Sequence, residues 1–415
     1  MSWFGATVRD RRVLALLLVL IAFSPGRALG EVRPTDTLGE VSVASSKTLT
    51  GVAPDVTLPS GILETADGEL LWARAQDEER SMASTTKIMT AIVVLDSGVQ
   101  LDERVTVPSE AARVGEAGVG LVPGQELTVR QLLEAMLVHS GNDAAITLAV
   151  HTSGSLDVFV EAMNAKAVEL DLRNSTFTNP HGLDEPGHHT SAADLATMAR
   201  YAMRKQAFRD IVQMKEVRIP VGSSTRRFEA SNLLLGTFNG ATGIKTGWTS
   251  DAGYCLVASA ERDGIELFAV VLGTKTENAR FVQAKRLLDW GFSHYAIKQV
   301  TSAEQTASIV AVTDYLDRTV PAVVAETTST AVYDIRGPIT VKADVVGEIA
   351  APVSKGQRLG TLTVEQAGRL LAQVPIVAAR SVPVPTFWEA VQIGAVRLWR
   401  KLFGGALQAV PVTVM

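Results

Sequence analysis

The amino-acid sequence predicts an α+β domain with helices packed on an antiparallel sheet, then a small all-β domain and a C-terminal amphipathic helix. Three observations lead to this architecture. Residues 60–295 carry strand patterns at both ends and helical patterns in the middle, so early and late strands are expected to share one sheet. Residues 297–378 alternate valine and threonine with polar residues between turn signals. Residues 386–408 return to a helical period.

Local signals predict the elements of the α+β domain in chain order. Asp67-Gly68 separates apolar runs at 62–66 and 70–73, which indicates a hairpin. The next pattern is a helix over 84–97. Caps, turns and periods predict the later elements in the same way: helices that begin at Thr128, with Gln131 completing a capping box, and over 156–170, 191–204 and 278–294, and a strand hairpin at 254–260 and 265–272.

The first thirty residues are typical of a secretory signal peptide. Three arginines between residues 9 and 12 precede an apolar run over 13–23, and small residues at 28–30 offer a cleavage site. The apolar run is shorter than the ~20 residues that span a bilayer. An uncleaved N-terminal anchor is the alternative. In either case the body of the protein is expected outside the cytoplasm, in an extracytoplasmic or periplasmic location.

The C-terminal segment 386–408 is expected to form an amphipathic helix with aromatic side chains on one face. The apolar arc of its helical wheel contains Phe387, Trp388, Val391, Ala395, Leu398, Trp399 and Leu402. Arg397, Arg400 and Lys401 lie opposite, and Ile393 and Val396 interrupt the polar side. Tryptophans beside cations suit a helix that lies in a membrane interface. We therefore expect peripheral anchoring to the cytoplasmic membrane, and an ordinary docking helix of the last domain is the alternative.

Composition agrees with an exported protein of several domains. With 415 residues, of which 47% are hydrophobic, the chain can bury two or three cores. A net charge of −5 gives no electrostatic argument for nucleic-acid binding. The single cysteine, Cys255, excludes an internal disulfide and predicts a buried hydrophobe. We divide the chain into a signal peptide (1–30), a flexible leader (31–55), the α+β domain (56–295), the small β domain (296–380) and the terminal helix (386–408).

Ser84 and Lys87 are three residues apart and share one face of the first predicted helix. Serine becomes a good nucleophile when a base removes its proton, and a lysine can be that base when burial or nearby cations lower its pKa. A helix start also favours negative charge that develops on a substrate oxygen. Taken alone, the pair is as well explained by a serine cap and a solvated lysine, because chance supplies this spacing about once or twice in such a chain.

Two further motifs favour a catalytic interpretation. Ser140-Gly141-Asn142 falls in a turn between helices, where a hydroxyl and a carboxamide can relay a proton and hold a substrate amide. Lys245-Thr246-Gly247 begins a strand expected at the sheet edge, where a cation and a hydroxyl can bind a carboxylate and glycine lets a substrate backbone approach. Each motif could instead be an ordinary turn or strand start. The three motifs in this order are those of serine β-lactamases and penicillin-binding proteins.

The chain resembles the low-molecular-mass D-alanyl-D-alanine carboxypeptidases, the type-5 and type-6 penicillin-binding proteins. The residues that carry the resemblance are ASTTKIMTA at 83–91, HSGNDAA at 139–145, NPHGLD at 179–184 and GIKTGWT at 243–249. The resemblance covers essentially the whole chain, because a signal peptide, a β domain and a terminal anchor also occur in that family. It implies a penicillin-binding/β-lactamase-like catalytic domain.

By this resemblance the protein is expected to be a serine D,D-carboxypeptidase. It would remove the terminal D-alanine from peptidoglycan stem pentapeptides, and β-lactams would acylate it. Ser84 would attack the carbonyl between the two D-alanines, and Lys87 would take its proton. Ser140 would pass a proton to the departing D-alanine, and Asn142 would orient the peptide. No cofactor or metal is implied.

The resemblance also assigns residues to substrate binding. Lys245, Thr246 and Arg280 would hold the terminal carboxylate beside Gly247. The backbone N–H groups of Ser84 and Trp248 would form the oxyanion hole. Arg280 could instead be a solvated residue in the first turn of the last predicted helix of the domain. Trp248 departs from the family, in which many members have histidine or a small residue at that place.

The histidines do not suit a Ser-His-Asp arrangement. His139 precedes Ser140 at the end of a helix. His181, His188 and His189 cluster in a loop rich in glycine and proline and raise a metal hypothesis. Loop histidines with satisfied hydrogen bonds are the favoured interpretation, because neither cysteine nor a tight His-x-x-x-His spacing accompanies them.

Three other functions compete with the carboxypeptidase. A class A type β-lactamase would need Ser-Asp-Asn and a deacylating glutamate, and both Gly141 and the β domain argue against it. A D,D-endopeptidase of the same superfamily usually lacks the β domain. A non-catalytic penicillin-binding scaffold would not need the intact set of Ser84, Lys87, Ser140 and Lys245.

Overall fold

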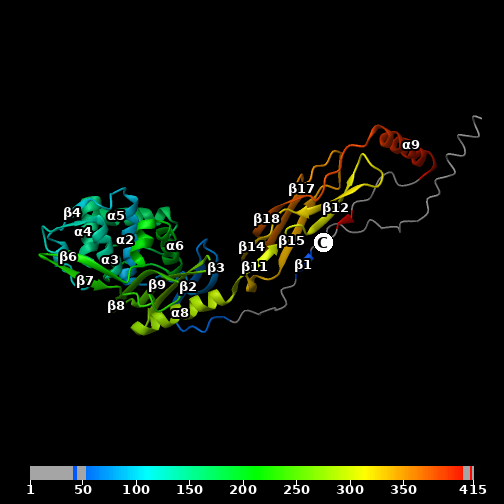
Figure 1. Ribbon diagram of the computed structural model, residues 1–415. Helices are drawn as coiled ribbons and strands as arrows, with labels where there is room; N and C mark the ends of the chain where they lie inside the picture. Colours follow the sequence, from blue (N-terminus) through cyan, green and yellow to red (C-terminus); the bar gives the residue numbers. More distant parts are fainter. Residues whose placement is uncertain (1–40, 44–52, 405–411, 414–415) are drawn as a thin grey trace, which may run out of the picture.

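The computed structural model describes residues 41–43, 53–404 and 412–413. They form two domains that follow one another along an elongated molecule (Figure 1), each with its own hydrophobic core. The predicted signal peptide, the rest of the predicted leader and residues 405–408 of the predicted terminal helix lie outside the described residues. The predicted boundary near residue 295 falls where the last helix of the first domain ends and the first strand of the second begins.

The first domain is built on a five-stranded antiparallel sheet in which early and late strands are neighbours, as the sequence predicted. Its spatial order is β3 (Leu70–Arg74), β2 (Ser60–Thr65), β10 (Ile265–Thr274), β9 (Gly253–Arg262) and β8 (Ala241–Thr249). The strands β2 and β10 are more than 190 residues apart in sequence yet pair directly, with Val270 opposite Ile62. The strand β8 pairs with β9 alone, so it lies at the sheet edge.

The middle of this sheet is covered on both faces. Along β10, Phe268 and Val270 face the larger core, and Leu267 and Val271 face a smaller one, as a strand with period two requires. Helix α8 (Glu277–Ser293) covers the smaller core. Helices cover the other face of the sheet (Figure 1). A run of apolar residues on a central strand is thus explained by burial on both sides.

The helices of the first domain begin with a short 3-10 turn. Residues Ala83–Thr86 form η1, which leads without interruption into α2, so the predicted helix over 84–97 is correct apart from its tighter first turn. The capping box of Thr128 and Gln131 and the cap at Ser191 are both present. The helices are α2 (Lys87–Asp96), α3 (Val129–Val138), α4 (Asn142–Ser153), α5 (Leu156–Glu169), α6 (Ala192–Met203) and α7 (Gln206–Val212).

This domain also has two small two-stranded sheets that were not predicted. The strand β4 (Arg104–Thr106) pairs with β5 (Glu126–Thr128), and the chain between them contains the 3-10 turn η2 (Ala111–Arg113). The strands β6 (Glu216–Val221) and β7 (Ser224–Glu229) form a hairpin at the end of the molecule far from the second domain (Figure 1).

The second domain is all-β, as predicted. Its main sheet has the order β1, β15, β17, β18, β13, β12 and β16, and β19 also pairs with β12. Strand β1, at Val41–Val43, lies within the predicted leader and adds to the edge strand β15, whose free backbone groups can recruit it. The strands are β11 (Tyr295–Thr301), β12 (Thr306–Val312), β13 (Thr319–Val324), β14 (Thr328–Tyr333), β15 (Ile339–Val345), β16 (Glu348–Ile349), β17 (Arg358–Gln366), β18 (Arg369–Ala378) and β19 (Val412–Thr413), with a 3-10 turn η3 at Asp334–Arg336.

The terminal helix α9 (Phe387–Phe403) rests on the end of the β domain farthest from the first domain (Figure 1). A stripe at helical spacing makes the contact. Glu389 pairs with Arg318 at 3.1 Å, Ile393 packs on the β-domain core, and Arg397 donates to the carbonyl of Thr313. Ile393 interrupts the polar side of the helical wheel because that side of α9 packs on the β domain. The predicted apolar face of α9 points into solvent.

Candidate active site

Ser84 and Lys87 meet at the junction of η1 and α2. The Nζ of Lys87 lies 2.8 Å from the Oγ of Ser84, 2.7 Å from the Oδ1 of Asn142 and 2.6 Å from the carbonyl oxygen of His181. Ser84 is half-buried, whereas Lys87 has no exposed surface. The amine is therefore enclosed by three oxygen atoms that come from three separate segments of the chain.

The surroundings of Lys87 lower its pKa well below the ordinary value. Burial is the largest cause and the nearby cation of Lys245 is the second, while the carboxylate of Asp143 partly opposes them. Both Asn142 Oδ1 and a backbone carbonyl can only accept hydrogen bonds. A neutral Lys87 amine can satisfy them with its two N–H groups and keep its lone pair for the hydroxyl proton of Ser84. This geometry suits a base that activates a serine.

The Ser140-Gly141-Asn142 turn connects α3 to α4, as the sequence predicted. Ser140 has a positive φ of 76°, which turns its side chain out of the helical path, and it lies at the pocket wall. Asn142 begins α4, and its side chain bridges Lys87 to the carbonyl of Gly115 at 3.2 Å. A Cβ on Gly141 would come within 2.9 Å of the Asp143 carboxylate, so glycine fits this crowded position.

A carboxylate that the sequence analysis did not assign orders the loop beside this turn. Asp143 is buried and accepts hydrogen bonds from the backbone N–H groups of Val119, Gly120 and Leu121 at 2.8–3.1 Å, in addition to that of Ala144. A buried carboxylate needs several such donors. The result is that residues 119–121 are tied to the start of α4.

The loop 178–190 clamps the start of the Ser84 helix. Asn179 Oδ1 accepts from the backbone N–H groups of His181 and Gly182, and its Nδ2 donates to the carbonyl of Leu183. This holds the turn that offers the His181 carbonyl to Lys87. A Cβ on Gly182, where φ is +93°, would lie 2.0 Å from the carbonyl oxygen of Ala83, so only glycine allows this approach.

The loop histidines have structural partners. His188 Nδ1 accepts from the backbone N–H of Thr178, so its Nε2 is the protonated nitrogen that donates to Thr86 Oγ1 at 2.9 Å. Burial lowers the pKa of His188 to about 4, and burial with the nearby Lys87 lowers that of His181 to about 3. Within the part of the chain that the structure describes, no three His, Cys, Asp or Glu residues are grouped as a metal site would require.

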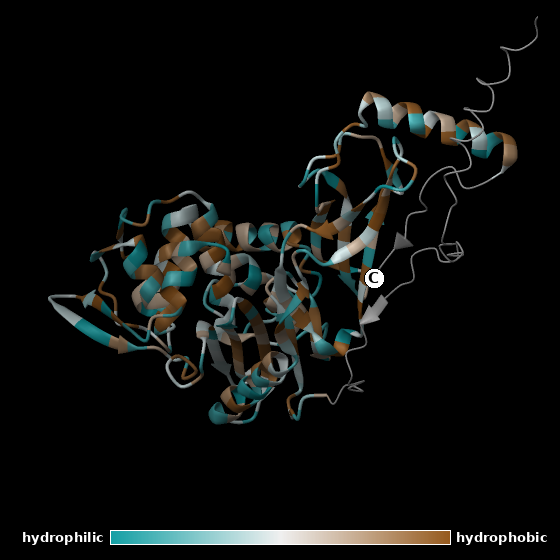
Figure 2. Cartoon of the chain, turned by 45° about the vertical axis from the view of Figure 1, so that its right-hand side comes forward, coloured by the Kyte–Doolittle hydropathy of each residue, from teal (hydrophilic) through white to brown (hydrophobic). Residues whose placement is uncertain are grey.

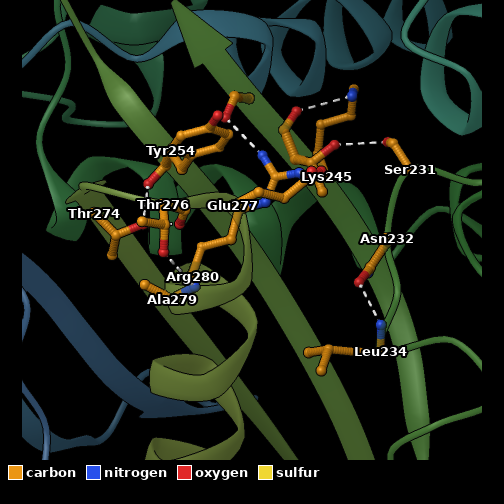
Figure 3. Close-up of polar contacts among 12 residues, drawn as sticks. Ser231, Asn232, Leu234, Lys245, Tyr254, Thr274, Thr276, Glu277, Ala279 and Arg280 are labelled. Carbon is orange, nitrogen blue, oxygen red and sulfur yellow. Dashed lines mark hydrogen bonds and ion pairs between the residues drawn. The ribbon is translucent and has the colours of Figure 1, made fainter.

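Lys245, Thr246 and Gly247 lie on the edge strand β8, directly beside the nucleophile segment. Lys245 is fully buried and donates to the carbonyl of Thr246 at 2.9 Å, and Thr246 exchanges a hydrogen bond with Ser231 at 2.6 Å (Figure 3). Burial and the cation of Arg280 lower the pKa of Lys245 to about 7. A Cβ on Gly247 would come within 3.0 Å of the backbone nitrogen of Ser84, so glycine permits this close approach.

Arg280 and Trp248 complete this wall. Arg280 is in the first turn of α8 and is only 4% exposed, so it is not a solvated helix residue. It donates to the carbonyl of Gly247 at 3.0 Å and pairs with Glu277 at 2.8 Å (Figure 3). Trp248 is 53% exposed and tilts against Tyr254, with ring centroids 5.9 Å apart. The guanidinium of Arg280 lies over the other ring of this pair, Tyr254, at 5.4 Å.

These elements surround one open pocket of about 470 Å³. Its lining residues are Ser84, Glu116, Ala117, Ser140, Thr246, Gly247, Trp248 and Arg280. Six of these eight were predicted from sequence, and the remaining predicted residues, Lys87, Asn142 and Lys245, are buried behind the lining. Glu116 and Ala117 were missed, because they lie on a loop without any motif.

A serine beside a buried lysine, with a second lysine on the adjacent sheet edge, defines a serine acyl-transfer enzyme of the penicillin-recognising class. Comparison with known proteins specifies the family. The family model described as D-alanyl-D-alanine carboxypeptidase, peptidase S11, matches residues 52–276, which is more than half of the chain. The model described as penicillin-binding protein 5, C-terminal domain, matches residues 295–384. The chain belongs to the D-alanyl-D-alanine carboxypeptidase family.

Individual relatives agree with this assignment. The chain is 34% identical to D-alanyl-D-alanine carboxypeptidase DacF of Bacillus subtilis over 76% of its own length and 83% of that protein. Among solved structures, penicillin-binding protein 5 from Haemophilus influenzae matches with a TM-score of 0.60 and 27% identity, over 80% of this chain and 99% of that one. The Streptomyces K15 DD-transpeptidase matches with a TM-score of 0.56 and 32% identity, over 59% of this chain and all of that one.

Proposed function

We propose that this protein is a serine D,D-carboxypeptidase that removes the terminal D-alanine from peptidoglycan stem pentapeptides and that penicillins acylate. The observation that carries the proposal is the enclosed amine of Lys87, 2.8 Å from Ser84 and with a strongly lowered pKa. The D-alanyl-D-alanine carboxypeptidase family supplies the substrate class.

Acylation begins at Ser84. The neutral amine of Lys87 takes the hydroxyl proton as the serine oxygen attacks the carbonyl between the two D-alanines. The carbonyl oxygen becomes an oxyanion, which the backbone N–H groups of Ser84 and Trp248 stabilise. The close approach of Gly247 to Ser84 supports this placement, since it brings the backbone of β8 next to that of η1 at the nucleophile.

The departing D-alanine needs a proton on its nitrogen and a partner for its carboxylate. Ser140 lies at the pocket wall with a hydroxyl that can pass a proton onward from Lys87. Asn142, fixed between Lys87 and Gly115, orients the peptide amide. The cation of Lys245, the Thr246 hydroxyl and the guanidinium of Arg280 attract the carboxylate. Water then hydrolyses the acyl-enzyme.

The loop that reaches Lys87 argues against a β-lactamase. A class A β-lactamase uses a glutamate to activate the deacylating water. Here the loop 178–190 presents the backbone carbonyl of His181 to Lys87, and Gly182 is packed against Ala83. A carbonyl cannot accept a proton from water as a carboxylate does. We therefore expect penicillin to acylate the enzyme and to leave it slowly.

The direct test is release of D-alanine from a pentapeptide that ends in D-Ala-D-Ala. The full chain should release one D-alanine per peptide, and Ser84→Ala should release none. The variant Ser109→Ala, on an exposed loop, is the matched control. Rapid hydrolysis of penicillin without D-alanine release would favour the β-lactamase. Transfer of the peptide to an added amine in place of water would favour a transpeptidase.

We further propose that the protein works outside the cytoplasm and that α9 attaches it peripherally to a membrane surface. The helix alternates hydrophobic and hydrophilic residues (Figure 2) and turns a large apolar face to solvent. That face consists of Phe387, Trp388, Val391, Leu398, Trp399, Leu402 and Phe403, each between 49% and 75% exposed. So much exposed aromatic surface indicates an interface, and cations lie at its border. No helix among the described residues is long and apolar enough to cross a bilayer.

Flotation with vesicles tests the membrane proposal. The full chain should float with vesicles that contain anionic lipid, and Trp388→Ser combined with Trp399→Ser should remain at the bottom. The matched control is Val168→Ser combined with Leu233→Ser, which removes exposed apolar residues from the other domain. Equal flotation of both double variants would rule out α9 as the anchor.

A further inference from the structure

One charged side chain that lines the pocket has no role in the proposed mechanism. Glu116 lines the pocket together with Ser84 and Ser140, and it is exposed to solvent. No hydrogen bond or ion pair to its carboxylate is present in the described part of the chain. The cations of the site, Lys245 and Arg280, come from the β8 and α8 wall, whereas Glu116 comes from the loop before β5.

The backbone on both sides of Glu116 is fixed by one catalytic residue. Asn142 donates from its backbone N–H to the carbonyl of Ala117 at 2.9 Å and from its Nδ2 to the carbonyl of Gly115 at 3.2 Å. Asp143 ties down residues 119–121 of the same loop. Glu116 itself adopts a left-handed conformation with a φ of +59°. The backbone that carries this unpaired carboxylate is thus held in place beside the pocket, in a conformation that glutamate seldom adopts.

The two walls of the pocket therefore carry opposite charge. A peptide whose terminal carboxylate lies on the cationic wall leaves its acyl portion near the other wall, where a carboxylate repels anions and attracts cations. We propose that Glu116 is a specificity-determining residue that favours substrates with an ammonium-bearing side chain on the residue before the two D-alanines. This inference rests on the proposed D,D-carboxypeptidase activity.

A pair of substrates, one with this charge and one in which it is removed, tests the inference. They are Nα-acetyl-L-lysyl-D-alanyl-D-alanine, with a free side-chain amine, and the same peptide with that amine acetylated. Because exposed ion pairs are worth about a factor of two to five, the wild type should show a kcat/KM ratio of about two to five in favour of the amine. Glu116→Gln should bring this ratio close to one, and higher salt should lower it in the wild type alone.

A charge swap separates recognition from general damage to the loop. In Glu116→Lys the preference should invert toward a peptide whose lysine side chain is succinylated and therefore anionic. Glu110→Gln, an exposed carboxylate on the same loop, is the matched control and should keep the wild-type ratio. A ratio that is equal in wild type and Glu116→Gln, with D-alanine still released, would overturn the inference alone. Absence of D-alanine release from all peptides by the wild type would overturn the proposed function and the inference with it.

Discussion

At the scale of single residues, the chemistry depends on two buried lysines that share one site. Lys87 and Lys245 are both fully buried, and each has a lowered pKa. The cation of Lys245 helps to keep Lys87 neutral, and a positive charge on Lys245 attracts the substrate carboxylate. The pair needs opposite protonation states, with Lys87 as the neutral base and Lys245 as the cation, and their mutual repulsion favours that distribution.

The pH dependence of acylation follows from this coupling. The rate of acylation rises with pH as Lys87 loses its proton. The affinity for a substrate carboxylate falls as pH rises above about 7, because Lys245 then loses its charge. In Lys245→Gln the pKa of Lys87 should rise, because a cation that lowers it is gone. The acid limb of the rate of penicillin acylation should then move to higher pH. An acid limb at the wild-type position would show that Lys245 does not tune Lys87.

Much of the site could be predicted at this scale, because its motifs have a fixed spacing that places them on predicted helices, turns and strands. The residues concerned are Ser84, Lys87, Ser140, Asn142 and Lys245. The parts that could not be predicted depend on backbone groups and loop contacts. The partner that completes the base is the carbonyl of His181, and a backbone carbonyl has no sequence signature. Asp143 stands next to the Ser140-Gly141-Asn142 motif, but three of its four backbone partners, residues 119–121, come from a loop that no pattern predicted. The role of Glu116 depends on that same loop.

At the scale of elements, the loop 178–190 helps to hold the nucleophile segment in place. It joins α5 to α6 and contacts η1 and α2 through Thr86, Thr90 and Ala83. Sequence patterns predicted the helices on either side but only a polar loop between them. The pairs β4–β5 and β6–β7 were also missed. The strands β4 and β5 have only three residues each, and β6 packs its apolar residues on neighbouring helices instead of on a second sheet.

Protonation of His188 should release this loop. Its pKa is about 4 in the folded protein and 6.5 ordinarily, so between these values the unfolded chain binds more protons than the folded one. Stability therefore rises with pH across this window and is lost as pH falls from about 6.5 toward about 4. In His188→Gln the thermal midpoint should fall less between pH 7 and pH 5 than it does in the wild type. His151→Gln, a half-buried histidine on α4, is the control.

At the scale of the whole molecule, the two domains are joined by α8 and by charge. Helix α8 leads directly into β11, and the hairpin turn between β2 and β3 carries acidic residues that meet arginines of the β domain. Arg369 pairs with Asp67 at 2.5 Å and with Glu69 at 2.6 Å, and Arg336 also pairs with Glu69. The division into these domains was predicted from the change of period, but ion pairs between distant segments could not be.

These ion pairs should restrict the angle between the domains. In Arg369→Gln, small-angle scattering should show a broader distribution of interatomic distances than in the wild type, and high salt should broaden the wild-type distribution in the same direction. Arg358→Gln, which changes an exposed arginine that hydrogen-bonds within its own strand to Gly360 and Thr361, should leave the distribution unchanged. Identical scattering from wild type and Arg369→Gln would mean that the ion pairs of Arg369 do not restrict the angle.

The central claim of this account is that Ser84 is the nucleophile, and a mass measurement tests it most directly. The protein is incubated with benzylpenicillin, digested and mapped by mass spectrometry. The account predicts one penicilloyl group, attached to the peptide that contains Ser84, and none in Ser84→Ala. A penicilloyl group on any other residue, or its persistence in Ser84→Ala, would contradict the account.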